Sequence, residues 1–189
     1  MTIDETVTVK GSPVRSLQRF IEAELTPAQR DEVFSKLPPD FAARFGSPVL
    51  ATELIPVYLL NRVTEEAAKI KGEALDSFAR RAGREAASDA VKGIYRFFAR
   101  VLTPPALLSK ASQMWSSLYS RGELRVDNQT ERSARLRLLN YPTETANCLR
   151  ITGWLERMAE MTGSKQVQVT QTQCFAKGAP HCEWIVEWG

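Results

Sequence analysis

The C-terminal segment 174–189 constrains the fold more than any other part of the chain, because it places two cysteines on either side of a tight turn. Gly178 and Pro180 lie between Cys174 and Cys182, and both residue types favour turns. The pattern predicts a β-hairpin in which one strand ends at Cys174 and the next begins at Cys182. We therefore expect the two thiols to lie close together.

This hairpin closes a predicted ββαββ unit. After Gly122, apolar and polar residues alternate, as in half-buried strands, at Leu124, Val126, Ala134, Leu136, Leu138, Val167, Val169, Trp184, Val186 and Trp188. Thr143 is expected to cap the intervening helix, whose inner stripe recurs at helical spacing: Cys148, Ile151, Leu155 and Met158. Strands that alternate in this way predict an antiparallel sheet with one wet face and one face covered by helices.

The N-terminal half reads as mostly helical. A short strand or an ordered arm is expected over 6–10, helices from Ser12 and over 26–37, and a loop or single turn over 41–48. A longer helix begins at Pro56, is interrupted at Gly72 and continues through a segment rich in alanine and glycine; Thr103 caps the next helix. The predicted fold class is α+β, with a helical N-terminal half packed on one face of a four-stranded antiparallel sheet. We expect a single domain over 1–189, in which 1–50 is a helical extension and 51–189 the core.

Composition excludes several classes of protein. Lys and Arg total 25 and Asp and Glu total 22, so the net charge of +3 gives no indication of a nucleic-acid partner. No apolar run approaches the roughly 20 residues that span a bilayer. The acidic N-terminus lacks the apolar core of a signal peptide. The three cysteines therefore read as reduced thiols in a cytoplasmic protein without membrane insertion.

The cysteines form a candidate metal site. Zinc favours tetrahedral cysteine and histidine ligands, and the hairpin presents a thiol at each end. Cys148 lies on the helix predicted to pack under the same sheet, so we take Cys148, Cys174 and Cys182 as candidate ligands of a structural zinc ion. Two alternatives remain open: small buried hydrophobic side chains, which free cysteines often are, and a disulfide, which a reducing cytoplasm disfavours.

Aromatic side chains supply a candidate ligand site. Phe97 and six further aromatic residues fall on predicted helices, where they either line an apolar cavity or simply fill the core. The expected ligand contacts are Phe78, Tyr95, Phe98, Trp115, Tyr119 and Trp154. Catalysis is not expected, because the only histidine, His181, has no evident serine, acid or second histidine partner in the sequence pattern.

The segment 174–182, together with Cys148, resembles the end of a 4-vinyl reductase-type domain. This domain type belongs to the superfamily of haem-nitric-oxide-binding-like and TRAPP-type vesicle-tethering domains. The resemblance runs from Phe78 to Trp188, and the whole chain also resembles an uncharacterised family found mainly in myxobacteria. In phenol-sensing bacterial activators with this domain, the residues that match the three cysteines bind a structural zinc, so the resemblance implies the same role here.

The chain departs from those sensors at two points. They use a glutamate three residues before the second cysteine, where this chain has Gln171, and a neutral amide is a poor zinc ligand. His181 or water is then the candidate for the fourth position. The chain also has no clear counterpart of the histidine and tryptophan that hold phenol, so specificity for aromatic compounds is not implied.

The combined interpretation is a non-enzymatic ligand-binding or sensory regulatory domain. We expect a small apolar molecule between the helices and the sheet, and signalling through an unidentified protein partner. A homodimer is expected to form through the alanine- and glycine-rich helix 79–93. The alternative is a ligand-free scaffold or assembly module resembling TRAPP-type tethering subunits. An enzyme of tetrapyrrole or vinyl-group metabolism has only the name of the domain type in its favour.

Overall fold

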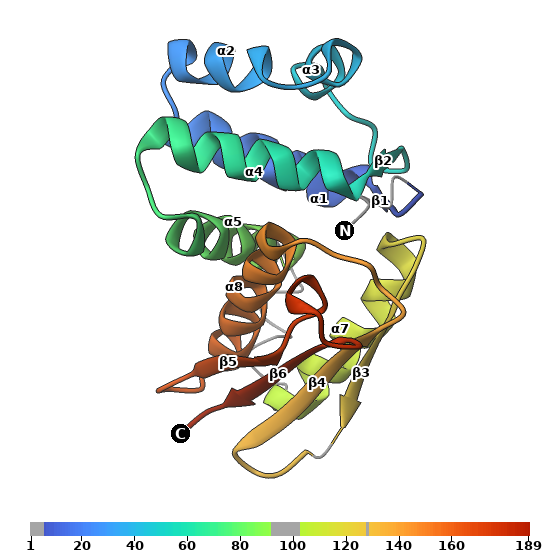
Figure 1. Ribbon diagram of the computed structural model, residues 1–189. Helices are drawn as coiled ribbons and strands as arrows, with labels where there is room; N and C mark the ends of the chain where they lie inside the picture. Colours follow the sequence, from blue (N-terminus) through green and yellow to red (C-terminus); the bar gives the residue numbers. More distant parts are fainter. Residues whose placement is uncertain (1–5, 92–102, 128) are drawn as a thin grey trace.

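The structure, a computed structural model, describes residues 6–91, 103–127 and 129–189 (Figure 1). The N-terminal half contains, in chain order, β1 (Thr8–Lys10), α1 (Gly11–Glu24), α2 (Pro27–Ser35), α3 (Pro39–Phe45), β2 (Leu54–Pro56), α4 (Val57–Lys71) and α5 (Leu75–Ala90). The C-terminal half contains α7 (Pro104–Leu118), β3 (Glu123–Asp127), β4 (Ser133–Leu139), α8 (Thr145–Met161), β5 (Gln168–Gln173), the short 3₁₀ helix η1 (Phe175–Lys177) and β6 (Cys182–Glu187). The predicted α+β fold class is confirmed.

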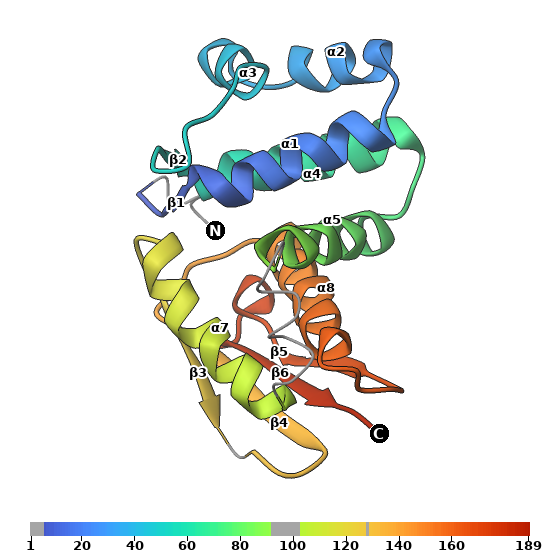
Figure 2. The same ribbon diagram turned by 180° about the vertical axis from the view of Figure 1, so that it is seen from behind.

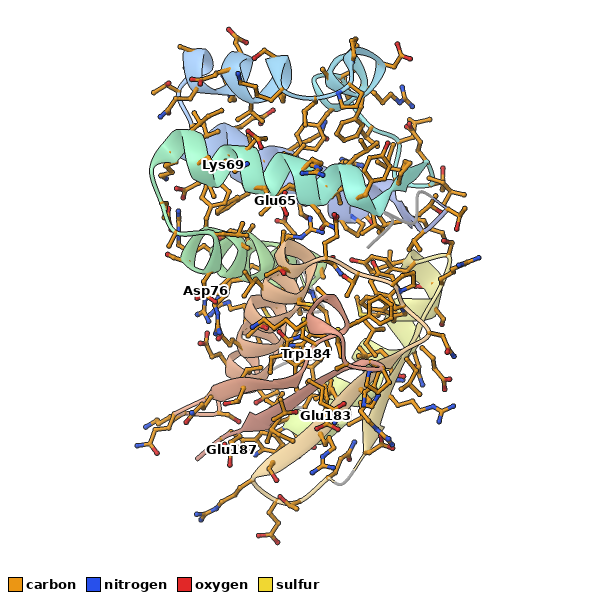
Figure 3. The ribbon with its side chains drawn as sticks, in the orientation of Figure 1. Glu65, Lys69, Asp76, Glu183, Trp184 and Glu187 are labelled. Atoms are coloured by element: carbon orange, nitrogen blue, oxygen red, sulfur yellow. The ribbon has the colours of Figure 1, made fainter. Side chains whose placement is uncertain are left out.

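The four C-terminal strands form one antiparallel sheet in the order β3-β4-β6-β5. Leu136 on β4 pairs with Trp184 on β6, and both side chains lie on the face of the sheet that α7 and α8 bury. Figure 2 shows α7 lying across β3 and β4. The indole of Trp184 donates to the hydroxyl of Thr152 on α8 at 2.9 Å. The next residue along β6, Glu183, is on the opposite face and accepts from Thr172 at 2.7 Å; both β6 residues are labelled in Figure 3. The alternation of the sequence therefore becomes two chemically different faces, as predicted.

Proline chemistry explains one success and one error in the N-terminal half. Thr26 and Gln29 form the predicted capping box at the start of α2, with Pro27 in the first turn. The prediction of a loop or a single turn over 41–48 is wrong, because the seven-residue helix α3 occupies Pro39–Phe45. Pro38 and Pro39 end α2, yet Pro39 also fits the first turn of a new helix, where its missing N–H is not needed.

The short strand predicted near the N-terminus is present, and it links the two halves of the fold. β1 pairs antiparallel with β2, a strand the sequence did not indicate, with Val9 opposite Ile55. Val9 also forms a β-bridge with Tyr119, and the backbone N–H of Ser120 donates to the carbonyl of Thr8 at 3.0 Å. The backbone around Tyr119 is thereby fixed against the N-terminal half.

The small residues of α5 pack inside the chain against α8. Gly83 faces the backbone of Arg150, and Gly153 faces the backbone of Arg80, so closely that a Cβ on either glycine would overlap a carbonyl oxygen. Ala79, Ala82 and Ala87 are buried as well. The described part of this face of α5 is therefore covered by α8 of the same chain, while the homodimer stays a prediction.

The prediction that Thr143 caps α8 is wrong. The helix begins after Glu144, and Thr143 is buried, where its hydroxyl accepts from the amide of Asn147 at 3.0 Å. No described helix has the combination of length and apolar character that crossing a membrane requires.

Glu24 connects α1 to α4 and α5 by ion pairs. Arg81 donates to it at 2.6 and 2.9 Å, and Lys71 forms a second ion pair. The hydrogen bond from Arg81, followed by that from Lys71, lowers the pKa of Glu24 from 4.5 to about 2. Such a shift links the stability of the helical layer to pH.

We expect Glu24→Gln to lower the free energy of unfolding by about 1–2 kcal/mol at neutral pH. This value is smaller than the pKa shift alone would give, because Arg81 is partly exposed and solvent screens the ion pair. The folded-state pKa lies below the unfolded value, so this contribution is complete above pH 4.5 and is lost as the pH falls towards 2. Denaturant unfolding of both proteins across that range measures it. Glu85→Gln, at an exposed site on α5, is the control, and a Glu24→Gln penalty independent of pH would contradict the assignment.

Candidate functional site

A cavity of about 440 Å³ lies where the N-terminal helices meet the C-terminal half. Its walls come from α1, α4 and α5 on one side and from α7, α8 and β3 on the other. Most of the lining is apolar and includes Leu17, Leu60, Met114, Leu118, Leu124 and Ile151. The volume lies within the range of small-molecule sites, and such sites are typically apolar with a few polar groups.

Three of the six predicted ligand contacts line this cavity: Trp115, Tyr119 and Trp154. The rings of Trp115 and Tyr119 are stacked with their centroids 4.0 Å apart, and the Trp115 indole donates to the carbonyl of Arg121 at 3.1 Å. Phe78 does not line the cavity; it is fully buried against Phe20 instead. Tyr95 and Phe98 fall outside the described residues. The structure thus brings together the aromatic residues of α7 and α8.

Arg150 on α8 supplies a charge to the cavity wall. Its Nη2 donates to the side-chain oxygens of Asn61 at 3.1 Å and Asn147 at 2.9 Å. Burial lowers the pKa of Arg150, and nearby Tyr119, Tyr141 and Glu144 oppose that effect. The guanidinium nevertheless remains protonated, because its ordinary pKa is so high.

The partners of Arg150 are themselves held in place. The amide of Asn147 donates to Thr143 at 3.0 Å, which turns its oxygen towards Arg150. The amide nitrogen of Asn61 donates to a carboxylate oxygen of Glu144 at 2.7 Å, so the side-chain oxygen of Asn61 also faces Arg150. Both asparagines are buried. This network fixes the position of the guanidinium before any ligand arrives.

Further polar residues belong to the cavity lining. Arg19 on α1 forms an ion pair with Asp89 near the end of α5, and it also donates to Ser16 at 3.3 Å. Arg15 lines the same region and is exposed. The ion pair between Arg19 and Asp89 thus connects α1 to α5 beside the cavity.

Sequence reasoning did not single out Asn147 and Arg150. A signal was present, since Asn147, Arg150 and Trp154 are spaced 3 and 4 residues apart and so share one face of α8. That face adjoins the predicted apolar stripe of the same helix. A polar pair beside such a stripe indicates a helix that borders both core and cavity.

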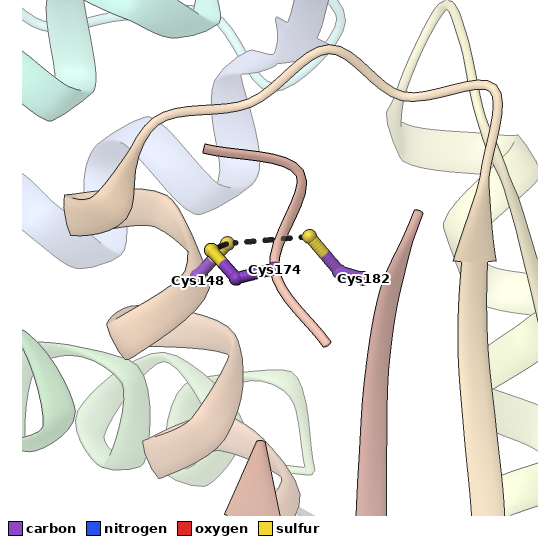
Figure 4. A group of neighbouring side chains, drawn as sticks. All are labelled: Cys148, Cys174 and Cys182. Atoms are coloured by element: carbon purple, nitrogen blue, oxygen red, sulfur yellow. Dashed lines mark hydrogen bonds between the residues drawn. The ribbon is translucent and has the colours of Figure 1, made fainter. Parts of the chain in front are cut away.

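The second candidate site is the cysteine cluster (Figure 4). Cys148 lies on α8, Cys174 follows β5 and Cys182 opens β6, and all three are buried and free of disulfides. Their sulfurs lie within 4.8 Å of one another, with 3.5 Å between Cys148 and Cys182 and 3.8 Å between Cys148 and Cys174. The predicted meeting of thiols distant in the sequence is confirmed.

These distances suit a metal ion. Zinc–sulfur bonds of about 2.3 Å place two ligands of a tetrahedral site about 3.8 Å apart. The separations of Cys148 from its two neighbours lie close to that value, whereas a disulfide needs about 2.05 Å. The cluster could therefore hold a metal ion with only small movements of the sulfurs.

The hydrogen bonds of the cluster favour a thiolate at Cys182. Cys174 donates to Cys148, while Cys182 accepts from the backbone N–H of Phe175 at 3.3 Å. The hydrogen bond with Cys148 lowers the pKa of Cys182, and the one from Phe175 adds to this effect. The same bond to Cys182, together with burial, raises the pKa of Cys148. The sulfur of Cys182 is therefore the one best prepared to bind a cation.

A fourth ligand is not fixed by the described residues. His181 is not part of the cluster, although it precedes Cys182. The side chain of Gln171 lies against Cys148, and Gln171 and Cys174 both line a broad polar depression beside β5. Solvent can therefore approach the cluster from this side.

Comparison with known proteins identifies the fold. No protein-family model and no curated protein matches the chain. Among solved structures, an H-NOX protein from S. oneidensis in the Fe(II)NO ligation state aligns with 95% of this chain and 99% of its own, with a TM-score of 0.71 and 16% identity. The Fe(II) unliganded H-NOX protein from K. algicida aligns with 95% of this chain and 96% of its own, with a TM-score of 0.73 and 9% identity.

A third similar structure, an oxygen-binding H-NOX domain related to soluble guanylate cyclases, aligns with 94% of this chain and 92% of its own at a TM-score of 0.64 and 11% identity. These matches include the N-terminal helices as well as the ββαββ half. They support the expected relation to haem-nitric-oxide-binding-like folds, but they do not confirm the resemblance to 4-vinyl reductase-type or TRAPP-type domains. The chain has the H-NOX fold.

Proposed function

We propose that this protein is a non-enzymatic sensory domain that binds a small apolar molecule in the cavity between α1, α5, α7 and α8. The observation that carries the proposal is the cavity itself, with its apolar lining and its stacked pair of Trp115 and Tyr119. A cavity of about 440 Å³ leaves apolar side chains without contacts that a ligand of matching shape would supply. Ligand binding therefore stabilises this arrangement.

The position of the cavity suggests how binding becomes a signal. Its walls belong to the N-terminal helices on one side and to the C-terminal half on the other. An occupant that contacts both sides favours one relative packing of these parts over another, which is all that a population shift needs. We propose that a protein partner reads this difference on the outer surface.

The similar structures include iron-containing H-NOX proteins with nitric oxide or oxygen bound, so haem is the first ligand to consider. Haem iron in proteins takes an axial histidine, cysteine, methionine or tyrosine. This chain has one histidine, His181, and it does not line the cavity. Of the described lining residues, only Met114 and Tyr119 carry such a donor.

Neither donor suits haem. Tyr119 would have to bind iron as a phenolate, yet burial raises its pKa, and its ring is held in a stack against Trp115. Methionine typically serves as a second ligand opposite histidine. The described lining residues therefore do not fit haem, and we propose an organic molecule without iron as the ligand.

We also propose that the cysteine cluster holds a structural zinc ion. Three buried sulfurs at near-tetrahedral separations, one of them with a lowered pKa, form a favourable donor set for this metal. The ion would join α8, which also lines the cavity, to the hairpin of β5 and β6. Its role is to fix the helix that carries Arg150 and Trp154.

The neutral dye phenylnaphthylamine is expected to bind the wild-type protein once per chain, because its fused aromatic body matches an apolar cavity. Ala86→Phe places a ring into the cavity from α5 and is expected to reduce the affinity for the dye at least about tenfold while preserving stability. Fluorescence titration and thermal unfolding measure the two effects.

Ala106→Phe, at an exposed site on α7, is the matched control and should bind the dye like the wild type. Two outcomes would contradict the proposal: no saturable binding by the wild-type protein, or undiminished binding by Ala86→Phe. The first outcome would favour the ligand-free scaffold alternative.

A further inference from the structure

Arg150 differs from the other arginines of the helices that surround it. Arg81 pairs with Glu24 and Glu73, and Arg84 pairs with Glu156 and Glu160. Arg150 has no carboxylate within ion-pair distance among the described residues, although it is half-buried in the wall of an apolar cavity. A guanidinium in such a position is costly unless an anion accompanies it.

The hydrogen bonds of Arg150 leave part of the guanidinium unused. Its Nη2 is occupied by the neutral side-chain oxygens of Asn61 and Asn147. Its Nε is buried without a hydrogen-bond partner, and no described residue accepts from Nη1. The two asparagines thus orient the group without neutralising its charge. Planar, oriented N–H donors of this kind recognise carboxylates and related anions.

The nearest acid, Glu144, is already engaged. It accepts a hydrogen bond from Asn61, which separates its carboxylate from the guanidinium. Arg19 in the cavity lining is paired with Asp89, and Arg15 is exposed to solvent. Among the arginines of the described cavity lining, Arg150 is therefore the one that combines burial with the lack of a carboxylate partner.

We propose that the ligand of this cavity is a small organic acid, whose acidic group is bound by Arg150 and whose apolar body lies against Trp115, Tyr119 and Trp154. The inference rests on the proposed function, since it names the chemical class that the same cavity binds. An acid head group would complete the hydrogen bonding of Arg150 and supply its missing counter-charge. The aromatic residues then select an apolar body rather than a free inorganic anion.

Two dyes with the same aromatic skeleton test the assignment, because anilinonaphthalene sulfonate carries an anionic group that phenylnaphthylamine lacks. We expect the wild-type protein to bind the sulfonate at least about tenfold more tightly than the neutral dye. In competition with the neutral dye, we expect decanoate to displace it at least about tenfold more effectively than decanol does. Arg150→Met should abolish both preferences; each is a ratio measured within one protein, so any change in the affinity for the neutral dye does not affect the comparison. Arg157→Met, on the same helix but outside the cavity lining, should retain both preferences.

Equal affinity of the wild-type protein for the two dyes would overturn the assignment and leave the proposed function intact, whereas failure of both dyes to bind would overturn both. A preference for anions that survives Arg150→Met, or that disappears in Arg15→Met instead, would also overturn it. If Arg150→Met does not fold, the wild-type dye ratio still decides, together with Arg150→Lys. The lysine variant keeps the charge but loses the planar donors, so its preference should be intermediate.

Discussion

One zinc ion per chain is expected to bind to the metal-free protein and to raise its free energy of unfolding by about 4 kcal/mol when free zinc exceeds its dissociation constant a thousandfold. The reason is that the sulfurs of Cys148, Cys174 and Cys182 are already gathered within 4.8 Å, so little ordering remains to be done on binding. The unfolded chain separates these residues and binds the metal more weakly. Native mass spectrometry and denaturant unfolding, each with and without chelator, measure stoichiometry and stability.

Cys182→Ser tests the ligand set, because it removes the sulfur with the lowered pKa and changes the side chain by a single atom. We expect this variant to lose both the bound zinc and the stabilisation by zinc. His181→Ala removes the neighbouring residue that is outside the cluster and should keep both. Zinc that persists in Cys182→Ser would show that the cluster is not the site, whereas zinc that disappears in His181→Ala would make His181 the fourth ligand.

The affinity for zinc should fall as the pH is lowered, because each cysteine must lose its proton to bind. Hydrogen bonding favours the thiolate at Cys182 but opposes it at Cys148, whose pKa is raised. Titration of zinc at several pH values measures this slope.

The cysteine cluster was predictable because two independent patterns converge on it. The turn between Cys174 and Cys182 sets their proximity, and the stripe on α8 that contains Cys148 must face the sheet. Each argument uses only local periodicity and the rule that apolar faces meet. The metal itself does not follow from such patterns, because buried thiols also occur without one.

The cavity was harder to predict, because residues on a cavity wall and residues in the core share the same periodicity. Phe78 and Trp115 both lie on apolar helix faces, yet the first packs against Phe20 and the second lines the cavity. Which of them borders an empty volume depends on how α5, α7 and α8 cross. That geometry comes from contacts between distant segments, such as the approach of Gly83 to Arg150.

The alanine- and glycine-rich pattern of α5 illustrates the same limit. Small residues at helical spacing predict a close helix approach but do not name the neighbour. We expected a second copy of the chain at this face; the structure places α8 of the same chain against Gly83, and the homodimer itself stays a prediction. In the same way β2 was missed, because three residues that pair only with β1 leave no periodic signal.

The close crossing of α5 and α8 leads to a second prediction of large effect. Gly83→Ala and Gly153→Ala are each expected to lower the free energy of unfolding by about 3 kcal/mol or more, although alanine normally favours helices. The added methyl group would meet the backbone carbonyl of Arg150 in the first case and of Arg80 in the second. Backbone atoms in two packed helices cannot turn aside as a flexible side chain would, so the helices must separate.

Gly46→Ala is the matched control, because it adds the same methyl group where φ is −74° and the nearest atom lies 3.3 Å away. We expect it to change the free energy of unfolding by less than about 1 kcal/mol. Denaturant unfolding compares the variants. If Gly83→Ala is as stable as Gly46→Ala, then α5 and α8 do not cross as closely as described. The cavity wall that contains Arg150 would then have to be placed differently as well, because the carbonyl that Gly83 contacts belongs to that residue.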